Sequence, residues 1–258
     1  MDTTLIIDFL SREWIINMTI TFILIAIYFV LGSKTKKENL PTFLKVSSFL
    51  VLAMTLSNHM ILAYIDSWTL KNNLPIHLCS ISALICCFIG FIKNKQILFE
   101  FLFYAGIIGG LLSLLTPQIT LYNELNFFYI MFYFKHASII VIPIFMMSHM
   151  KMRLSKLSWL KVFGLINLLL AIVLPINSAI DSNYLYVSRP PMVNNPLIIE
   201  DLNKIFGIPT YVYYWEIIML IFLLLLYYLF KKKEGFFKNH SDYVKGNTFW
   251  HSLRNKPK

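Results

Sequence analysis

The sequence predicts an all-α integral membrane protein: a bundle of seven transmembrane helices, with the N-terminus outside and the C-terminus in the cytoplasm. Composition, the spacing of apolar stretches and the placement of positive charge all point this way. Of the 258 residues, 57% are hydrophobic, and the mean hydropathy is +0.65. A soluble domain has too little interior to bury so much apolar surface, so the composition places the chain in a bilayer.

Seven stretches reach the roughly 17–25 mostly apolar residues that a spanning helix needs. The first follows acidic residues and no small-residue cleavage site, which favours a mature span over a signal peptide. The second is the least uniform, because Asn58 and His59 interrupt it. The predicted spans are 14–32, 46–65, 74–92, 97–116, 127–147, 157–177 and 209–230.

Lysine and arginine residues set the predicted orientation. The loops at 33–45, 93–96 and 148–156 hold four, two and three of them, and the tail after residue 230 holds eight. These regions alternate to one side, whereas the opposite side holds four in all. The positive-inside rule therefore places the C-terminus in the cytoplasm of a multi-pass protein of the cell membrane. The net charge of +10 then reflects contact with anionic lipid, and nucleic acid is not an expected partner.

Two segments lie outside the predicted spans. Residues 178–208 form a long outer loop whose tyrosines and apolar residues favour a cap lying on the bundle. Residues 236–258 form a basic, aromatic tail suited to the inner membrane surface. We therefore expect one transmembrane domain over residues 1–235, followed by this tail.

Polar residues inside the spans concentrate in the predicted outer half of the bilayer. Ionisable groups are costly there and often mark function, so their shared depth indicates one constellation. A structural interpretation stays open for each, since a membrane histidine can simply join two helices by a hydrogen bond. The residues are Asn58, His59, His77, Cys79, Lys135, His136 and Glu216.

All three cysteines lie in one apolar segment, so no disulfide framework follows from their spacing. Buried free cysteine commonly acts as a small hydrophobe, which is our interpretation of Cys86 and Cys87. For Cys79 that interpretation competes with an activated thiol. His77, two residues away on a continuous helix, is a poor base for Cys79 unless Pro75 keeps the first turn irregular.

A histidine on another helix is the better base for this thiol. His136 could take the proton of Cys79, which makes both candidate catalytic residues. Glu216 could orient the imidazole of His136 or balance Lys135, with which it could also simply pair. A Cys/His pair at this depth would meet lipid ester carbonyls, which points toward acyl transfer.

Two other interpretations use the same residues. The histidines and Glu216 could bind a zinc-like ion, but none shows the i, i+4 spacing of a helical metal site, so we predict no metal and no cofactor. A small-ligand transporter or sensor could use the same polar pocket without covalent catalysis. Against a transporter, the chain shows no inverted repeat.

Several motifs resemble the bacterial YwaF-like integral membrane family, which is similar to transmembrane-protein-164-type acyltransferases. They are Asn-His at 58–59, Leu-Pro-Ile-His-Leu-Cys-Ser at 74–80, Phe-Lys-His-Ala-Ser at 134–138, Asn-Tyr-Leu-Tyr at 183–186 and Trp-Glu at 215–216.

The resemblance implies a lipid acyltransferase in which Cys79 accepts an acyl chain and His136 assists. The expected partners are membrane lipids. Asn183, through its motif, joins His59, His77, Lys135, Asn58 and Glu216 as a candidate binding residue. Lys135 stands where the family usually carries an uncharged residue or a histidine, and its charge would favour the thiolate of Cys79 but disfavour protonation of His136.

Overall fold

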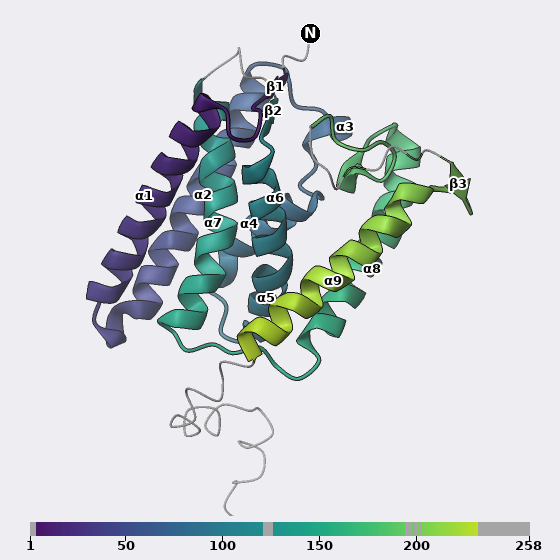
Figure 1. Ribbon diagram of the computed structural model, residues 1–258. Helices are drawn as coiled ribbons and strands as arrows, with labels where there is room; N and C mark the ends of the chain where they lie inside the picture. Colours follow the sequence, from purple (N-terminus) through teal and green to yellow (C-terminus); the bar gives the residue numbers. More distant parts are fainter. Residues whose placement is uncertain (1–3, 121–125, 194–197, 199–200, 202, 232–258) are drawn as a thin grey trace, which may run out of the picture.

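The computed structural model describes residues 4–120, 126–193, 198, 201 and 203–231, which are mostly helical (Figure 1). Very short strands and single turns connect the helices. The α-helices are α1 (Arg12–Lys34), α2 (Leu40–Tyr64), α3 (Leu70–Asn73), α4 (Leu78–Ile89), α5 (Gln96–Phe101), α6 (Ile107–Leu115), α7 (Asn126–Ser148), α8 (Ser158–Ile180) and α9 (Thr210–Lys231). The shorter elements are β1 (Thr4–Ile6), η1 (Lys37–Asn39), η2 (Leu102–Gly106), β2 (Gln118–Thr120), η3 (Tyr184–Tyr186), β3 (Lys204–Ile205) and β4 (Ile208–Pro209).

Within the described residues, six helices are long and apolar enough to cross a membrane. They are α1, α2 with the η1 turn before it, the continuous run α5–η2–α6, α7, α8 and α9. Each matches one predicted span to within a few residues, except that α2 begins at Leu40 rather than near residue 46. The chain is thus a multi-pass helical membrane protein.

The third predicted span, 74–92, is the exception, and the expected count of seven is not reached. Here the only helix is α4, which has 12 residues and is therefore about 18 Å long. A bilayer core is about 30 Å thick, so α4 is too short to cross it as a regular helix. Pro75 lacks a backbone N–H, and the backbone stays extended at Leu74 and at His77, with φ −69° and ψ 150° at His77. Helix formation therefore begins only at Leu78.

The helix α5–η2–α6 lies at the centre of the bundle. In its most apolar window 72% of the residues are buried, against 17% in α1, α8 and α9, whose apolar faces are left to lipid. Glycines let its neighbour α7 approach closely. A Cβ on Gly106 would lie 2.8 Å from the carbonyl oxygen of Ile139, and one on Gly110 would lie 3.0 Å from that of His136. Small residues of this kind allow close backbone contact between membrane helices.

Helices α8 and α9 form a hairpin that leans away from the other helices (Figure 1). Near the C-terminal end of α9 it meets the central helix, where the rings of Phe103 and Phe230 lie 5.0 Å apart. The hydroxyls of Tyr104 and Ser158 share a hydrogen bond of 2.8 Å at the start of α8. The hairpin is therefore joined to the bundle at this end, which leaves room for a cavity farther along.

Two antiparallel strand pairs close the remaining connections. Strand β1 pairs with β2, with Thr4 opposite Thr120, and this fixes the N-terminal segment beside the end of α6. Strands β3 and β4 form a small hairpin that leads into α9. The predicted tail at 236–258 lies outside the described residues. The orientation of the bundle stays a prediction from its lysines and arginines.

Candidate functional site

A cavity of about 560 Å³ lies among α2, α4, α6, α7, α8 and α9. Its volume falls in the range of about 300–1,000 Å³ typical of small-molecule sites. Seven of the eight residues singled out in the sequence line it, so the structure gathers them in one place while their roles stay predictions. These residues are Asn58, His59, His77, Cys79, Lys135, His136 and Glu216.

Cys79 lies in the first turn of α4. His77 is the N-cap residue, and the first intrahelical bond runs from the Ile81 amide to the His77 carbonyl at 2.9 Å. The amides of residues 78–80 thus have no intrahelical acceptor. The positive end of the helix dipole therefore lies at the sulfur, where it stabilises negative charge. The chain is irregular at Pro75, so the helix begins only at Leu78. This start places Cys79 in the first turn of α4.

The sulfur of Cys79 lies against α6. Its Sγ is 3.6 Å from the hydroxyl oxygen of Ser113 and would lie 3.0 Å from a Cβ on Gly109. The next residue, Gly110, contacts the backbone of His136 in the same way. Two consecutive glycines therefore let the thiol of Cys79 approach α6 on one side and the turn of α7 that carries His136 approach it on the other.

His136 is buried, and its hydrogen bond defines its tautomer. Nδ1 lies 2.7 Å from the carbonyl oxygen of Phe132. A carbonyl oxygen only accepts, so Nδ1 must carry the hydrogen, and in the neutral ring Nε2 keeps its lone pair. The ring also packs on Phe132, with 4.3 Å between centroids. This imidazole is thus held in the form that can accept a proton at Nε2.

The other two cavity histidines have the opposite tautomer. His59 Nδ1 accepts a hydrogen bond of 3.0 Å from the indole N–H of Trp68. His77 Nδ1 accepts one of 3.3 Å from the backbone N–H of Leu185. Both neutral rings therefore carry their hydrogen on Nε2 and can only donate from it. Of the three, His136 alone offers an unprotonated Nε2.

The ion pair between Lys135 and Glu216, one of the alternatives left open by the sequence, is not formed. One carboxylate oxygen of Glu216 accepts a hydrogen bond of 3.0 Å from Asn167. Lys135 has no ion-pair or hydrogen-bond partner among the residues that the structure describes, and it lines the same cavity as Cys79 and the histidines. Asn167, which sequence reasoning missed, orients the carboxylate in place of the lysine. Among the residues that the structure describes, no three His, Cys, Asp or Glu side chains lie close enough together to hold a metal ion.

Asn183 does not lie in the cavity, and its assignment as a binding residue is not supported by its position. Its side-chain oxygen accepts hydrogen bonds from the backbone N–H groups of Ser188 and Arg189, at 3.1 and 3.0 Å. Its amide group donates to the carbonyl of Arg189 at 2.9 Å. Asn183 thus folds the loop on itself, a common use of asparagine in turns.

That loop, residues 181–193, covers the cavity, and we call it the cap. Its residues Leu185, Tyr186 and Val187 are part of the cavity wall. Leu185 and Tyr186 both have positive φ, at 59° and 55°, a conformation that costs free energy outside glycine. The cap is therefore held in place by contacts rather than by local preference.

Two hydrogen-bonding side chains supply most of those contacts. Asn177, at the end of α8, binds the backbone N–H and C=O of Tyr184, both at 2.9 Å, and accepts from the Ser182 hydroxyl at 2.7 Å. The hydroxyl of Tyr184 donates to the carbonyl of Leu70 and accepts from the amide of Leu74, at 2.6 and 2.8 Å. The bonds of Asn177 thus tie the cap to α8, and those of Tyr184 tie it to α3 and to the non-helical segment before α4. No sequence pattern signalled them.

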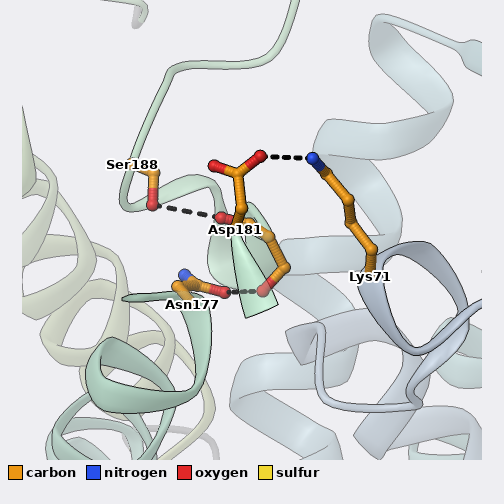
Figure 2. A network of polar contacts seen from close by, with 5 residues as sticks. Lys71, Asn177, Asp181 and Ser188 are labelled. Carbon is orange, nitrogen blue, oxygen red and sulfur yellow. Dashed lines mark hydrogen bonds and ion pairs between the residues drawn. The ribbon is translucent and has the colours of Figure 1, made fainter. Parts of the chain in front are cut away.

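An ion pair on the surface adds to this network. Figure 2 shows Lys71 reaching the carboxylate of Asp181, with Asn177 beneath it and Ser188 bonded to a neighbouring backbone oxygen. The hydrogen bond and charge of Lys71 lower the pKa of Asp181 below its ordinary value of 3.8. From that ordinary value up to neutral pH the contribution of the pair is therefore fully present, and it is lost as the pH falls through the lower pKa of the folded state.

We expect Asn177 rather than Asp181 to hold the cap. Asn177→Ala leaves buried backbone groups of Tyr184 without partners, which costs about 1–3 kcal/mol. Asp181→Asn removes only a pair whose side chains are 47% and 89% exposed, and such pairs contribute little. Thermal unfolding at neutral pH should show a lower Tm for Asn177→Ala alone. Equal losses in both variants would contradict this division.

The fold and the cavity define a polytopic helical membrane protein with a largely apolar pocket that gathers several polar side chains. Over residues 9–228 the chain matches the TMEM164 family, and it belongs to that family. It is 30% identical over 129 residues to an uncharacterized protein of Treponema pallidum (strain Nichols). That match covers 50% of this chain and 52% of the relative, so the chain spans about half the length of the curated relative it matches. No solved structure matches the chain.

Proposed function

We propose that this protein is a Cys/His acyltransferase acting on the acyl chains of membrane phospholipids. One observation carries the proposal: a thiol at the start of a helix shares a cavity with a histidine whose hydrogen bond leaves Nε2 unprotonated. A thiolate with a nearby base is the usual form of an activated cysteine. The resemblance of the sequence motifs to transmembrane-protein-164-type acyltransferases supports the same chemistry.

The proposed reaction has two steps. His136 Nε2 takes the thiol proton, and Cys79 Sγ attacks an ester carbonyl of a phospholipid. The carbon–oxygen bond breaks, the proton returns to the departing glycerol oxygen, and a thioester remains on Cys79. In the second step the hydroxyl of a lysophospholipid attacks the thioester and gives its proton through His136 to the released sulfur. Bonds and protons balance, so the exchange needs no cofactor.

The surroundings of the thiol suit this substrate. The cavity wall is apolar along α6, α7 and α9, where Leu112, Phe132 and Phe222 could contact an acyl chain. With the N-terminus outside and the C-terminus in the cytoplasm, as we propose, the cavity lies in the outer half of the cell membrane. A reporter fused after residue 258 that proved to be outside would reverse this assignment.

We expect Cys79→Ser to lower acyl exchange by about 10³-fold or more, because the oxygen nucleophile is far weaker at this site. The measurement is transfer of a labelled acyl chain from phospholipid to lysophospholipid by purified protein in vesicles. Cys87→Ser is the matched control, since Cys87 lies outside the cavity and its hydrogen bond to Thr55 suits a hydroxyl. Full exchange by Cys79→Ser would sink the proposal.

A further inference from the structure

Lys135 is the feature of the cavity that the proposed reaction leaves unexplained. It is the tenth residue of α7, about 13 Å from the start of the helix, and so lies near the middle of a span. Charged groups at such depth are costly and normally have a partner. No carboxylate lies within ion-pair distance of Lys135 among the described residues, and Glu216 is bonded to Asn167 instead. The cavity thus holds a cation that does not pair with the carboxylate of Glu216, which also lines it.

A second source of positive potential lies beside it. The amides at the start of α4 have no intrahelical acceptors, and the residue that caps this helix, His77, makes no side-chain capping bond. Lys135 lines the same cavity as His77 and Cys79, which lie at this end of α4. Both features favour an anion in the same part of the cavity.

We propose that Lys135 binds the phosphate group of the glycerophospholipid substrate. The inference rests on the proposed function, which identifies the reacting atoms. It adds Lys135 as the side chain that holds the substrate in position. In a glycerophospholipid the phosphate is only a few bonds from the oxygen that gains or loses the acyl chain. Lys135 and His136 are adjacent in the chain, and both line the cavity. One side chain therefore holds the phosphate while the next serves the reacting oxygen.

The direction of the side chain is consistent with this arrangement. Side chains of a helix point toward its N-terminus. For α7 that end adjoins β2, which is also the side of the bundle that carries the cap (Figure 1). A head group held by Lys135 would thus lie beneath the cap, and the apolar residues Phe132 and Met219 remain for the chain.

The test measures binding without turnover, in the full chain carrying Cys79→Ser. Lysophosphatidylcholine, lysophosphatidic acid and monoacylglycerol with the same acyl chain are titrated against the detergent-solubilised protein, with tryptophan fluorescence as the readout. We expect both phosphate-bearing lipids to bind at least about tenfold more tightly than monoacylglycerol, the size of one charge-assisted hydrogen bond. Lys135→Met should abolish this preference and leave monoacylglycerol affinity unchanged. Lys135→Arg should retain it.

Controls separate this inference from the proposed function. Lys156→Met removes an exposed lysine outside the cavity and should keep the preference. If Lys135→Met does not fold, Lys135→Gln takes its place with the same expected result. A preference that persists without Lys135 would overturn the inference, as would displacement of the lipid by inorganic phosphate alone, which would indicate a site for the free ion. Because Cys79 is already replaced, neither outcome depends on whether the native protein transfers acyl chains.

Discussion

His136→Gln is expected to lower kcat/KM for acyl exchange by about 10²–10⁴-fold, the range of a lost general base. Glutamine keeps polar atoms at this position but has no group that takes up a proton near neutral pH. The effect should be specific, because the tautomers of His59 and His77 leave no second unprotonated Nε2 in the cavity.

The control for this substitution is His149→Gln. His149 lies outside the cavity, where its ring stacks on Phe145 and hydrogen-bonds to Ser33. The same exchange assay should therefore show little change for His149→Gln. A loss of less than about tenfold in His136→Gln would show that another group accepts the thiol proton.

Gly109→Ala should produce the second large effect, a loss of about tenfold in kcat. The added Cβ would lie 3.0 Å from the sulfur of Cys79, closer than nine in ten such contacts, so the thiol must shift by a few tenths of an ångström. A displacement of about 1 Å at a reacting atom costs about a hundredfold, so this smaller shift costs about tenfold. The fold should survive, because no backbone atom is in the way.

Gly164→Ala is the matched substitution, since a Cβ on this glycine of α8 meets nothing within 4 Å. The two variants are compared in the exchange assay and in thermal unfolding. We expect similar Tm values and reduced turnover for Gly109→Ala alone. Unchanged turnover in Gly109→Ala would mean that the position of this sulfur does not limit the reaction.

Much of the architecture could be predicted from residue type alone. A helix such as α9 is almost wholly apolar over its length, so hydropathy located it to within a residue or two. The extent of α4 could not be read in this way. Residues 74–77 are as apolar as a span requires, but Pro75 and the contacts of His77 with the cap keep them out of a helix. Hydropathy measures the preference for lipid and not the path of the backbone.

The site was predicted as a set of residues but not as an arrangement. Depth along each span grouped His59, Cys79 and His136, and the structure places all three on one cavity, while their roles stay predictions. Which imidazole has its lone pair on Nε2 depends on hydrogen bonds to residues such as Phe132 and Trp68. Those bonds follow from packing between elements, and no spacing rule signals them.

The residues that hold the cap were even harder to predict from the sequence than the arrangement of the cavity. Asn183 stood out because of its motif, yet the structure gives it a local role in the turn. Tyr184 was noted only as part of that motif and as a tyrosine of the predicted cap, and Asn177 was not noted, yet both hold the cap. Tyr184 acts through partners over a hundred residues away, such as Leu74, and Asn177 acts by binding the backbone of Tyr184.

The most direct test of the account is the acyl-enzyme itself. Purified protein is incubated with phospholipid vesicles, without lysophospholipid, and its peptides are analysed by mass spectrometry. The account predicts one acyl chain on Cys79, labile to neutral hydroxylamine as a thioester is, with Cys86 and Cys87 unmodified and no adduct in Cys79→Ser. Acyl exchange that proceeds with Cys79 free of any adduct, in protein quenched during turnover, would contradict it.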